Sequence, residues 1–143
     1  MGSAIFETGA LGSAHAMKAL NNDVSAAGLI AACEAIQIGG AFGLDPQVMT
    51  DILNVSTGRN NTTENKLKPF ILTESYDSGF GLALMTKDIG IAADLADALG
   101  REAPFSHAVV ALARTALERL GPDADHTAID RYLKLLNRKP DAV

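Results

Sequence analysis

The stretch Thr8–Phe42, TGALGSAHAMKALNNDVSAAGLIAACEAIQIGGAF, opens with a glycine-rich turn and then continues to its end without a proline. At ~1.5 Å of rise per residue, a helix over residues 13–42 would be roughly 43 Å long. The Ser13 hydroxyl can accept a hydrogen bond from a free N–H group of the first turn, so Ser13 is the expected N-cap. Gly43 suits the left-handed conformation that ends many helices. We therefore predict one long helix around which the rest of the chain is organised.

The composition is that of an ordinary globular domain. Of 143 residues, 48% are hydrophobic and 20% are charged, which suits one domain with a sizeable core. The formal net charge of −5, without a Lys/Arg cluster, argues against a nucleic-acid-binding protein. The single cysteine, Cys33, cannot form an intramolecular disulfide and is expected to be buried, in a protein of a reducing compartment. Because the N-terminus lacks a secretory signal pattern, we expect a cytoplasmic location.

Residues 24–42 are apolar enough to be considered as a membrane span. Glu34 and Gln37 lie near the middle of this stretch, where each would be costly in hydrocarbon. Its many glycine and alanine residues would allow other helices to approach closely. We therefore expect a buried core helix and no membrane.

Cap and turn signals divide the rest of the chain into shorter helices. Asp45-Pro46 predicts an N-cap followed by a first-turn proline, with a helix that continues to about Asn54. The polar residues 59–68 are expected to form a loop or short helical turns. Further helices are predicted from Leu82 to about Gly100, from Pro104 to about Leu120, and over residues 127–136. The predicted fold class is all-α: a long central helix wrapped by five or six shorter helices, with no sheet beyond an isolated bridge.

Apolar periodicity predicts which face of each shorter helix is buried. The expected inward-facing residues are Val48, Met49, Ile52 and Leu53; Leu84, Ile91, Leu95 and Leu99; Val109, Val110, Leu112, Ala113, Leu117 and Leu120; and Ile129, Leu133 and Leu136.

Lys18 and Asn22 are four residues apart near the start of the long helix, so they share one face. A lysine near the positive end of a helix can serve as a general acid/base, and a substrate anion is favoured there. An asparagine beside it can donate and accept hydrogen bonds at once. The spacing alone also fits a surface lysine and asparagine without a role.

Three blocks of sequence resemble the β-hydroxyacid dehydrogenase family, which includes 3-hydroxyisobutyrate dehydrogenase and tartronate semialdehyde reductase. The first is Gly9-x-x-Gly12-Ser13-x-His15-x-x-Lys18-x-x-Asn21-Asn22, and the second is Phe80-x-Leu82-x-Leu84-Met85-x-Lys87-Asp88-Ile89. Between them lie Ser56-Thr57-Gly58-Arg59 and Glu64-Asn65-Lys66. The resemblance covers about Ile5 to Leu136, and Ala14 stands where the family usually has glycine. It implies a helical C-terminal domain like that of 6-phosphogluconate dehydrogenase.

The resemblance also implies a role for each matching residue. Lys18 would be the catalytic acid/base, and Lys87 would contact the cofactor, NAD or NADP. The substrate-binding residues would be Gly12, Ser13, Asn22, Phe80 and Asp88. The substrate would be a small 3-hydroxy acid or the matching semialdehyde, and no metal is implied. From spacing alone, Lys87 and Asp88 could equally be a solvated charge pair, and Phe80 could be an ordinary core residue.

The resemblance predicts that this sequence is one half of a two-domain enzyme. Residues 1–8 are expected to be a cloning scar and linker, and residues 9–143 a substrate-binding and oligomerisation domain, with the dinucleotide-binding domain missing. We expect the fragment alone to be inactive and to form a homodimer or tetramer. A non-catalytic relative and an imine reductase remain as alternatives, although Lys18 argues against both.

Overall fold

The computed structural model describes residues 12–138, and every regular element within them is helical. The long helix α1 spans Ser13–Phe42. Five shorter α-helices follow: α2 (Pro46–Leu53), α3 (Asn61–Asn65), α4 (Leu82–Ala98), α5 (Pro104–Leu120) and α6 (Ile129–Leu136). One π-helical turn, η1 (Leu67–Ile71), and one 3-10 turn, η2 (His126–Ala128), complete the described part. The predicted all-α class is confirmed, and an isolated antiparallel bridge joins Gly81 and Asp125. Gly9 and the expected linker lie outside the described residues.

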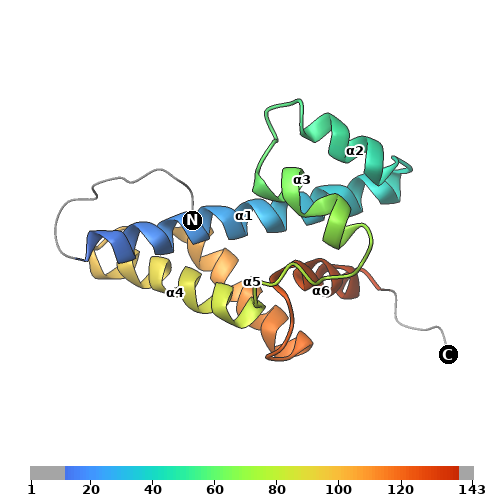
Figure 1. The fold of residues 1–143 in the computed structure, drawn as a ribbon. Coiled ribbons are helices and arrows are strands. Elements are labelled where there is room, and N and C mark those ends of the chain that lie inside the picture. Colours follow the sequence, from blue (N-terminus) through green and yellow to red (C-terminus); the bar gives the residue numbers. More distant parts are fainter. Residues whose placement is uncertain (1–11, 139–143) are drawn as a thin grey trace.

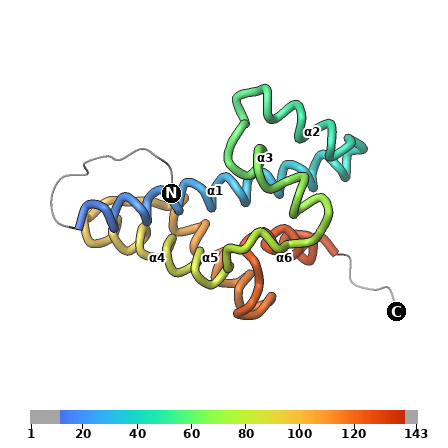
Figure 2. Tube along the Cα trace, viewed as in Figure 1, coloured from blue at the N-terminus to red at the C-terminus, as the bar shows by residue number. Residues whose placement is uncertain are grey.

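The shorter helices pack along α1 in two groups (Figure 1). Helix α4 runs antiparallel to the first half of α1, with α5 beside it, as the trace in Figure 2 shows. Helices α2 and α3 pack on the second half of α1, where the Asn60 side chain donates a 3.2 Å hydrogen bond to the Gly28 carbonyl. A Cβ atom at Gly28 would lie 3.0 Å from the Asn60 amide nitrogen, so a larger residue would require the Asn60 side chain to shift.

The predicted C-terminal end of α1 is confirmed, and the predicted N-terminal cap is wrong. Gly43 has a φ of 114°, and its N–H donates to the carbonyls of Gly39 and Gly40, as predicted for a helix end. At the start, the N-cap is Gly12 with a φ of 89°, and no side chain caps the helix. Ser13 was therefore wrongly predicted as the N-cap. Because glycine tolerates positive φ, the chain turns at Gly12 and Ser13 becomes the first helical residue.

The core is built where α1, α4, α5 and α6 meet. Leu29, Cys33, Ile89, Ala113 and Ile129 are each at most 1% exposed. The buried position predicted for Cys33 is confirmed. Burial raises the pKa of its thiol, and the nearby Asp130 carboxylate raises it further, so Cys33 stays protonated.

The predicted inward faces of three helices are partly wrong. On α4, Leu84, Ile91 and Leu99 are exposed, and the side that faces the core is instead formed by Leu82, Met85, Thr86, Asp88, Ile89, Gly90, Ala92 and Ala93. The small residues Gly90, Ala92 and Ala93 on this buried side let α4 approach its neighbours closely. On α2, Val48 and Ile52 are exposed, while Met49 and Leu53 pack against the core. Leu136, near the end of α6, is also exposed.

Helix α1 is long and apolar enough to cross a membrane by length and composition alone. Core helices pass the same test, and α1 buries Leu29, Ile30, Cys33 and Ile36 against the other helices. These contacts support its predicted place in a helical core.

Candidate functional site

The structure brings Asn22 and Asp88 together between α1 and α4. The Asn22 Nδ2 atom donates a 2.8 Å hydrogen bond to Asp88 Oδ2. Asp88 is 8% exposed, so its carboxylate depends on this bond for part of its solvation. The bond fixes the orientation of the Asn22 amide, whose Oδ1 atom lies 3.3 Å from the Asn21 amide nitrogen. The amide therefore has a set direction in which to meet a ligand.

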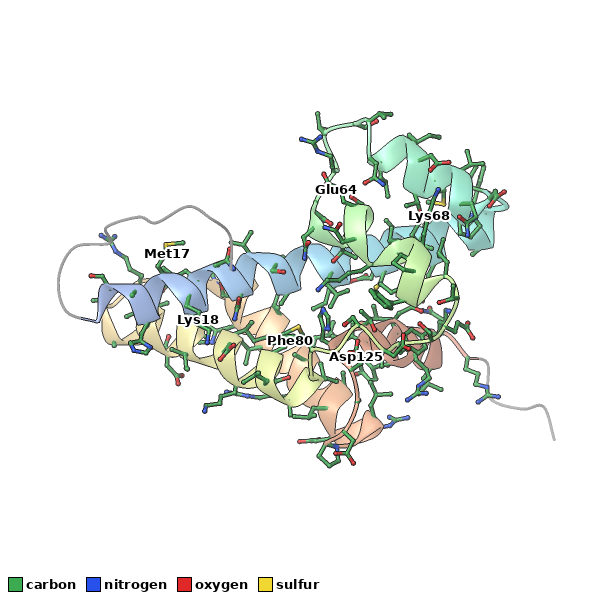
Figure 3. All side chains as sticks on the ribbon, in the orientation of Figure 1. Met17, Lys18, Glu64, Lys68, Phe80 and Asp125 are labelled. Carbon is green, nitrogen blue, oxygen red and sulfur yellow. The ribbon has the colours of Figure 1, made fainter. Side chains whose placement is uncertain are left out.

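Lys18 lies one helical turn before Asn22 and is exposed. Figure 3 shows it on the side of α1 that faces α4, whereas Met17 points to the opposite side. Within residues 12–138, Lys18 makes no ion pair or side-chain hydrogen bond. Its ammonium group is therefore accessible beside the Asn22–Asp88 pair.

The start of α1 adds backbone donors close to Lys18. The first intrahelical bond runs from the Ala16 N–H to the Gly12 carbonyl, so the N–H groups before Ala16 have no partner within the helix. Free N–H groups and the helix dipole both favour an anion at this end. Gly12 and Ser13 are thus placed to meet a carboxylate.

Lys87 and Phe80 do not join this group within the chain. Lys87 lies in a groove of about 470 Å³ between α4 and α5, which Arg114 also lines. Phe80 lies two residues before the start of α4 and eight residues before Asp88. Its ring packs edge-on against His126, with the ring centroids 5.2 Å apart. The structure thus gathers Lys18, Asn22 and Asp88, while Lys87 lines the groove between α4 and α5 and Phe80 packs against His126.

A polar cluster that the sequence did not predict surrounds His126, which is 3% exposed. Its ring contacts Lys66 at Nε2 and the Phe80 carbonyl at Nδ1, and Asp125 lies beside it. Burial and the positive charge of Lys66 lower the pKa of His126. Burial also lowers the pKa of Lys66, against the opposing effect of Asp125. Burial acts to raise the pKa of Asp125, but hydrogen bonds from Thr127, Ser78 and Gly79 hold it below its usual value.

One sequence signal could have found this cluster. An Asp two residues before a Thr marks a turn in which the carboxylate accepts the later N–H group, and Asp125 accepts from the Thr127 N–H at 3.0 Å. The sequence analysis gives His126 no role. Within the described residues, no group of three His, Cys, Asp or Glu side chains is arranged to hold a metal ion.

A further cavity lies elsewhere, between the second half of α1 and α6. Its volume is about 940 Å³, and its polar lining includes Gln37, Asp130 and Lys134. Asp130 is already bonded there to Gln37, Tyr76 and Lys134. Because these groups satisfy one another, we regard this region as structural and place the candidate site at Lys18.

Comparisons with known proteins agree with the resemblance in the sequence. A family model described as "NAD-binding of NADP-dependent 3-hydroxyisobutyrate dehydrogenase" matches residues 12–133. Mitochondrial 3-hydroxyisobutyrate dehydrogenase of Rattus norvegicus is 39% identical over 103 residues, covering 67% of this chain and 30% of that protein. The NAD-dependent L-serine dehydrogenase of Pseudomonas aeruginosa is 28% identical over 137 residues, covering 92% of this chain and 46% of that protein.

Among solved structures, 3-hydroxyisobutyrate dehydrogenase of Mycobacterium tuberculosis with L-serine superposes with a TM-score of 0.81 at 29% identity. The match covers 91% of this chain and 46% of that one. The chain thus spans less than half the length of these relatives.

Proposed function

The chain belongs to the 3-hydroxyisobutyrate dehydrogenase family, and from this premise we propose that it is the helical half of an NAD(P)-dependent dehydrogenase. The reaction would interconvert a small 3-hydroxy acid and its semialdehyde. One observation carries the proposal: an accessible Lys18 ammonium lies one turn from an Asn22 amide that Asp88 holds in place. This arrangement offers a proton carrier and an oriented hydrogen-bonding group to the same ligand.

The names of the relatives suggest the chemical class of the substrate. 3-Hydroxyisobutyrate, L-serine and 2-(hydroxymethyl)glutarate each carry a CH₂OH group on the carbon next to a carboxylate. A ligand of this kind presents one anion and one hydroxyl a short distance apart. The free N–H groups at Gly12–Ser13 suit the carboxylate, and Lys18 suits the hydroxyl.

In the proposed mechanism, this chain binds the substrate and moves its proton. A nicotinamide cofactor would supply the hydride acceptor for the carbinol carbon. As the hydroxyl is oxidised, the Lys18 amine takes its proton, and in the reverse direction the Lys18 ammonium returns a proton to the carbonyl oxygen. Asn22 orients the substrate, and Asp88 fixes Asn22.

Phe80 and Lys87 are proposed to act on parts of the ligands that this chain does not enclose alone. Phe80 would form an apolar contact with the substrate. Lys87 is an exposed cation in the groove between α4 and α5, so its charge suits a cofactor or substrate anion that approaches from that side. We use "complete enzyme" below for this chain joined to a dinucleotide-binding domain.

The proposal predicts activity for the complete enzyme and none for the 143 residues alone. The complete enzyme should oxidise 3-hydroxyisobutyrate or L-serine with NAD or NADP, followed by absorbance of the reduced cofactor. The isolated chain should show no turnover under the same conditions, because we propose that the cofactor binds mainly to the dinucleotide-binding domain. A panel without any active 3-hydroxy acid would contradict the proposed substrate class. Turnover by the isolated chain would contradict the proposed division of labour.

We further propose that two copies of the chain associate through α1. An apolar stripe lies along the exposed face of this helix and consists of Met17, Leu20, Val24, Ile38 and Phe42, which are between 42% and 84% exposed. Successive positions are three, four, fourteen and four residues apart. Each spacing is close to a whole number of helical turns, so the side chains share one face. Figure 3 shows Met17 on the side of α1 away from α4. Burying this stripe against the same stripe of a second copy would remove apolar surface from water.

Charged substitutions in the stripe should separate the two copies. In sedimentation equilibrium, the wild-type chain is expected at twice its mass of 14.9 kDa. Val24→Glu and Ile38→Glu should give the monomer mass, because each would place a carboxylate in the interface. Val55→Glu is the control, since Val55 is 86% exposed but lies outside α1. Wild-type chain that stays monomeric over a hundredfold concentration range would disprove the dimer.

A further inference from the structure

The turn that leads into η2 fastens the segment before α4. The Asp125 carboxylate accepts hydrogen bonds from Ser78 Oγ at 2.9 Å and from the Gly79 N–H at 2.9 Å. The His126 N–H donates to the Phe80 carbonyl at 2.8 Å. These contacts join residues 46 or 47 positions apart, and they end where α4 begins. The turn therefore fixes the entry to the helix that carries Lys87 and Asp88.

The partners of the His126 ring determine which nitrogen carries the proton. Nδ1 lies 3.0 Å from the Phe80 carbonyl, which can only accept, and 3.1 Å from Ser78 Oγ. Ser78 already donates its own proton to Asp125, so it too can accept from the ring. Nε2 faces the Lys66 ammonium, which can only donate. The neutral ring with Nδ1–H and a free Nε2 lone pair satisfies all of these contacts.

The same ring supports the Phe80 side chain. The two ring planes meet at 85° in an edge-to-face contact, and His126 is almost fully buried. Phe80 is therefore held twice by one residue, through its carbonyl and through its ring. A change in the orientation or protonation of the His126 ring would therefore alter its contacts with Phe80 directly.

We propose that His126 is a positioning residue that sets Phe80 and the start of α4 for substrate binding, and that Lys66 holds its ring in the required form. This role rests on the proposed function, in which Phe80 contacts the substrate. Neither His126 nor Lys66 touches the reacting atoms in this arrangement. They act through Phe80.

Acid should weaken this arrangement. The charged groups that act on the ring are Lys66, from the junction of α3 and η1, and Asp125, from its own turn. Burial and Lys66 lower the pKa of His126 from its usual 6.5, so the ring is neutral near pH 7. The pKa of His126 is lower in the folded chain than in the unfolded chain. The neutral ring therefore contributes its full stabilisation of the fold above the usual pKa, and this stabilisation is lost as the pH falls through the pKa of the folded chain. Protonation would place an N–H group against the Lys66 ammonium and break that contact.

The first test is NMR titration of the 143-residue chain with labelled histidine and phenylalanine. At pH 7.5, the ¹⁵N signals of His126 should show a protonated Nδ1 and an unprotonated Nε2. On acidification, the Phe80 amide should shift with the same midpoint as the His126 ring. In Lys66→Met the midpoint should move to higher pH, because a nearby positive charge is removed. An Nε2–H tautomer, or a Phe80 amide that does not follow the ring, would overturn the proposal.

The second test is made in the complete enzyme. It compares two variants that each keep a polar group near one of the two ring nitrogens. His126→Asn keeps a donor near the Nδ1 position, and His126→Gln keeps a polar atom near Nε2. His126→Gln should raise KM for 3-hydroxyisobutyrate roughly three- to tenfold, as expected for one lost hydrogen bond, and leave kcat nearly unchanged. His126→Asn should raise KM less. Both should lose the acid-side change in kcat/KM that His126 causes.

His107→Gln is the matched control, because His107 is exposed and pairs with Asp97 on the surface. It should keep the wild-type KM and pH profile. If Lys18→Ala leaves activity unchanged, the proposed function itself fails. If Lys18→Ala removes activity but His126→Gln keeps the wild-type KM and pH profile, the positioning role alone is wrong.

Discussion

Replacing Lys18 with alanine is expected to lower kcat of the complete enzyme by a factor of ~10² to 10⁴, the usual contribution of a general acid/base. KM should change little, because the proton is transferred in the transition state and the ground-state contacts of Asn22 and the α1 N-terminus remain. The measurement is steady-state oxidation of 3-hydroxyisobutyrate across a range of substrate concentrations. The accessible ammonium beside the Asn22–Asp88 pair motivates the expectation.

Two further lysine variants make this result specific. Lys18→Arg keeps the positive charge but cannot readily release its proton, so it should remain nearly as slow as Lys18→Ala. Lys68→Ala is the matched control, because Lys68 pairs with Asp51 on the surface, away from α4. It should retain wild-type kcat. A Lys18→Ala variant within about threefold of wild type would remove the assignment of Lys18 as the acid/base.

The long helix could be predicted closely because residues near its ends indicate where a helix can begin and end. The proline-free stretch and Gly43 together gave the observed C-terminus of α1. At the other end, Ser13 was predicted as the N-cap, but the N-cap is Gly12, whose φ of 89° glycine tolerates. Local residues thus predict that a helix begins or ends nearby, and the backbone conformation in the fold determines which residue is the cap.

The buried face of α4 could not be predicted from its large residues. Periodicity of Leu84, Ile91 and Leu99 suggested one face, yet all three are exposed. The opposite side of α4 packs closely against Arg114. A Cβ atom at Gly90 would lie 3.3 Å from the Arg114 guanidinium group. Close helix packing depends on small residues, and they carry little weight in a pattern built on large ones.

The candidate site was predictable only in part for a similar reason. The spacing of Lys18 and Asn22 puts them on one helix face, and this follows from the sequence alone. The contact from Asn22 to Asp88 spans 66 residues, and the contact from Lys66 to His126 spans 60. Family resemblance pointed to Asp88, but nothing local linked His126 to Lys66 or Phe80. Such pairs become visible only when the fold brings their helices together.

The buried network around Asp130 shows how α1 and α6 are held at the end of the molecule away from Lys18. Asp130 is 1% exposed, and its carboxylate accepts hydrogen bonds from Gln37 Nε2 at 2.9 Å and from the Tyr76 hydroxyl at 2.7 Å. Lys134 lies 3.0 Å away as its counter-ion. Tyr76 has a φ of 47°, an unfavourable backbone conformation for a non-glycine residue. Its bond to Asp130 helps to hold it there.

Replacing Asp130 with alanine should therefore lower the free energy of unfolding by about 3 kcal/mol, the lower end of the range for removing one partner of a buried ion pair. The lower end applies because Lys134 is 43% exposed and can regain water, whereas Gln37 and Tyr76 lose a buried partner. Asp130→Asn keeps the shape and one acceptor, so its loss should be smaller. Asp51→Ala is the control, because its exposed pair with Lys68 should contribute less than about 1 kcal/mol. Urea unfolding followed by circular dichroism measures all three variants, and equal losses for Asp130→Ala and Asp51→Ala would show that this network does not stabilise the fold.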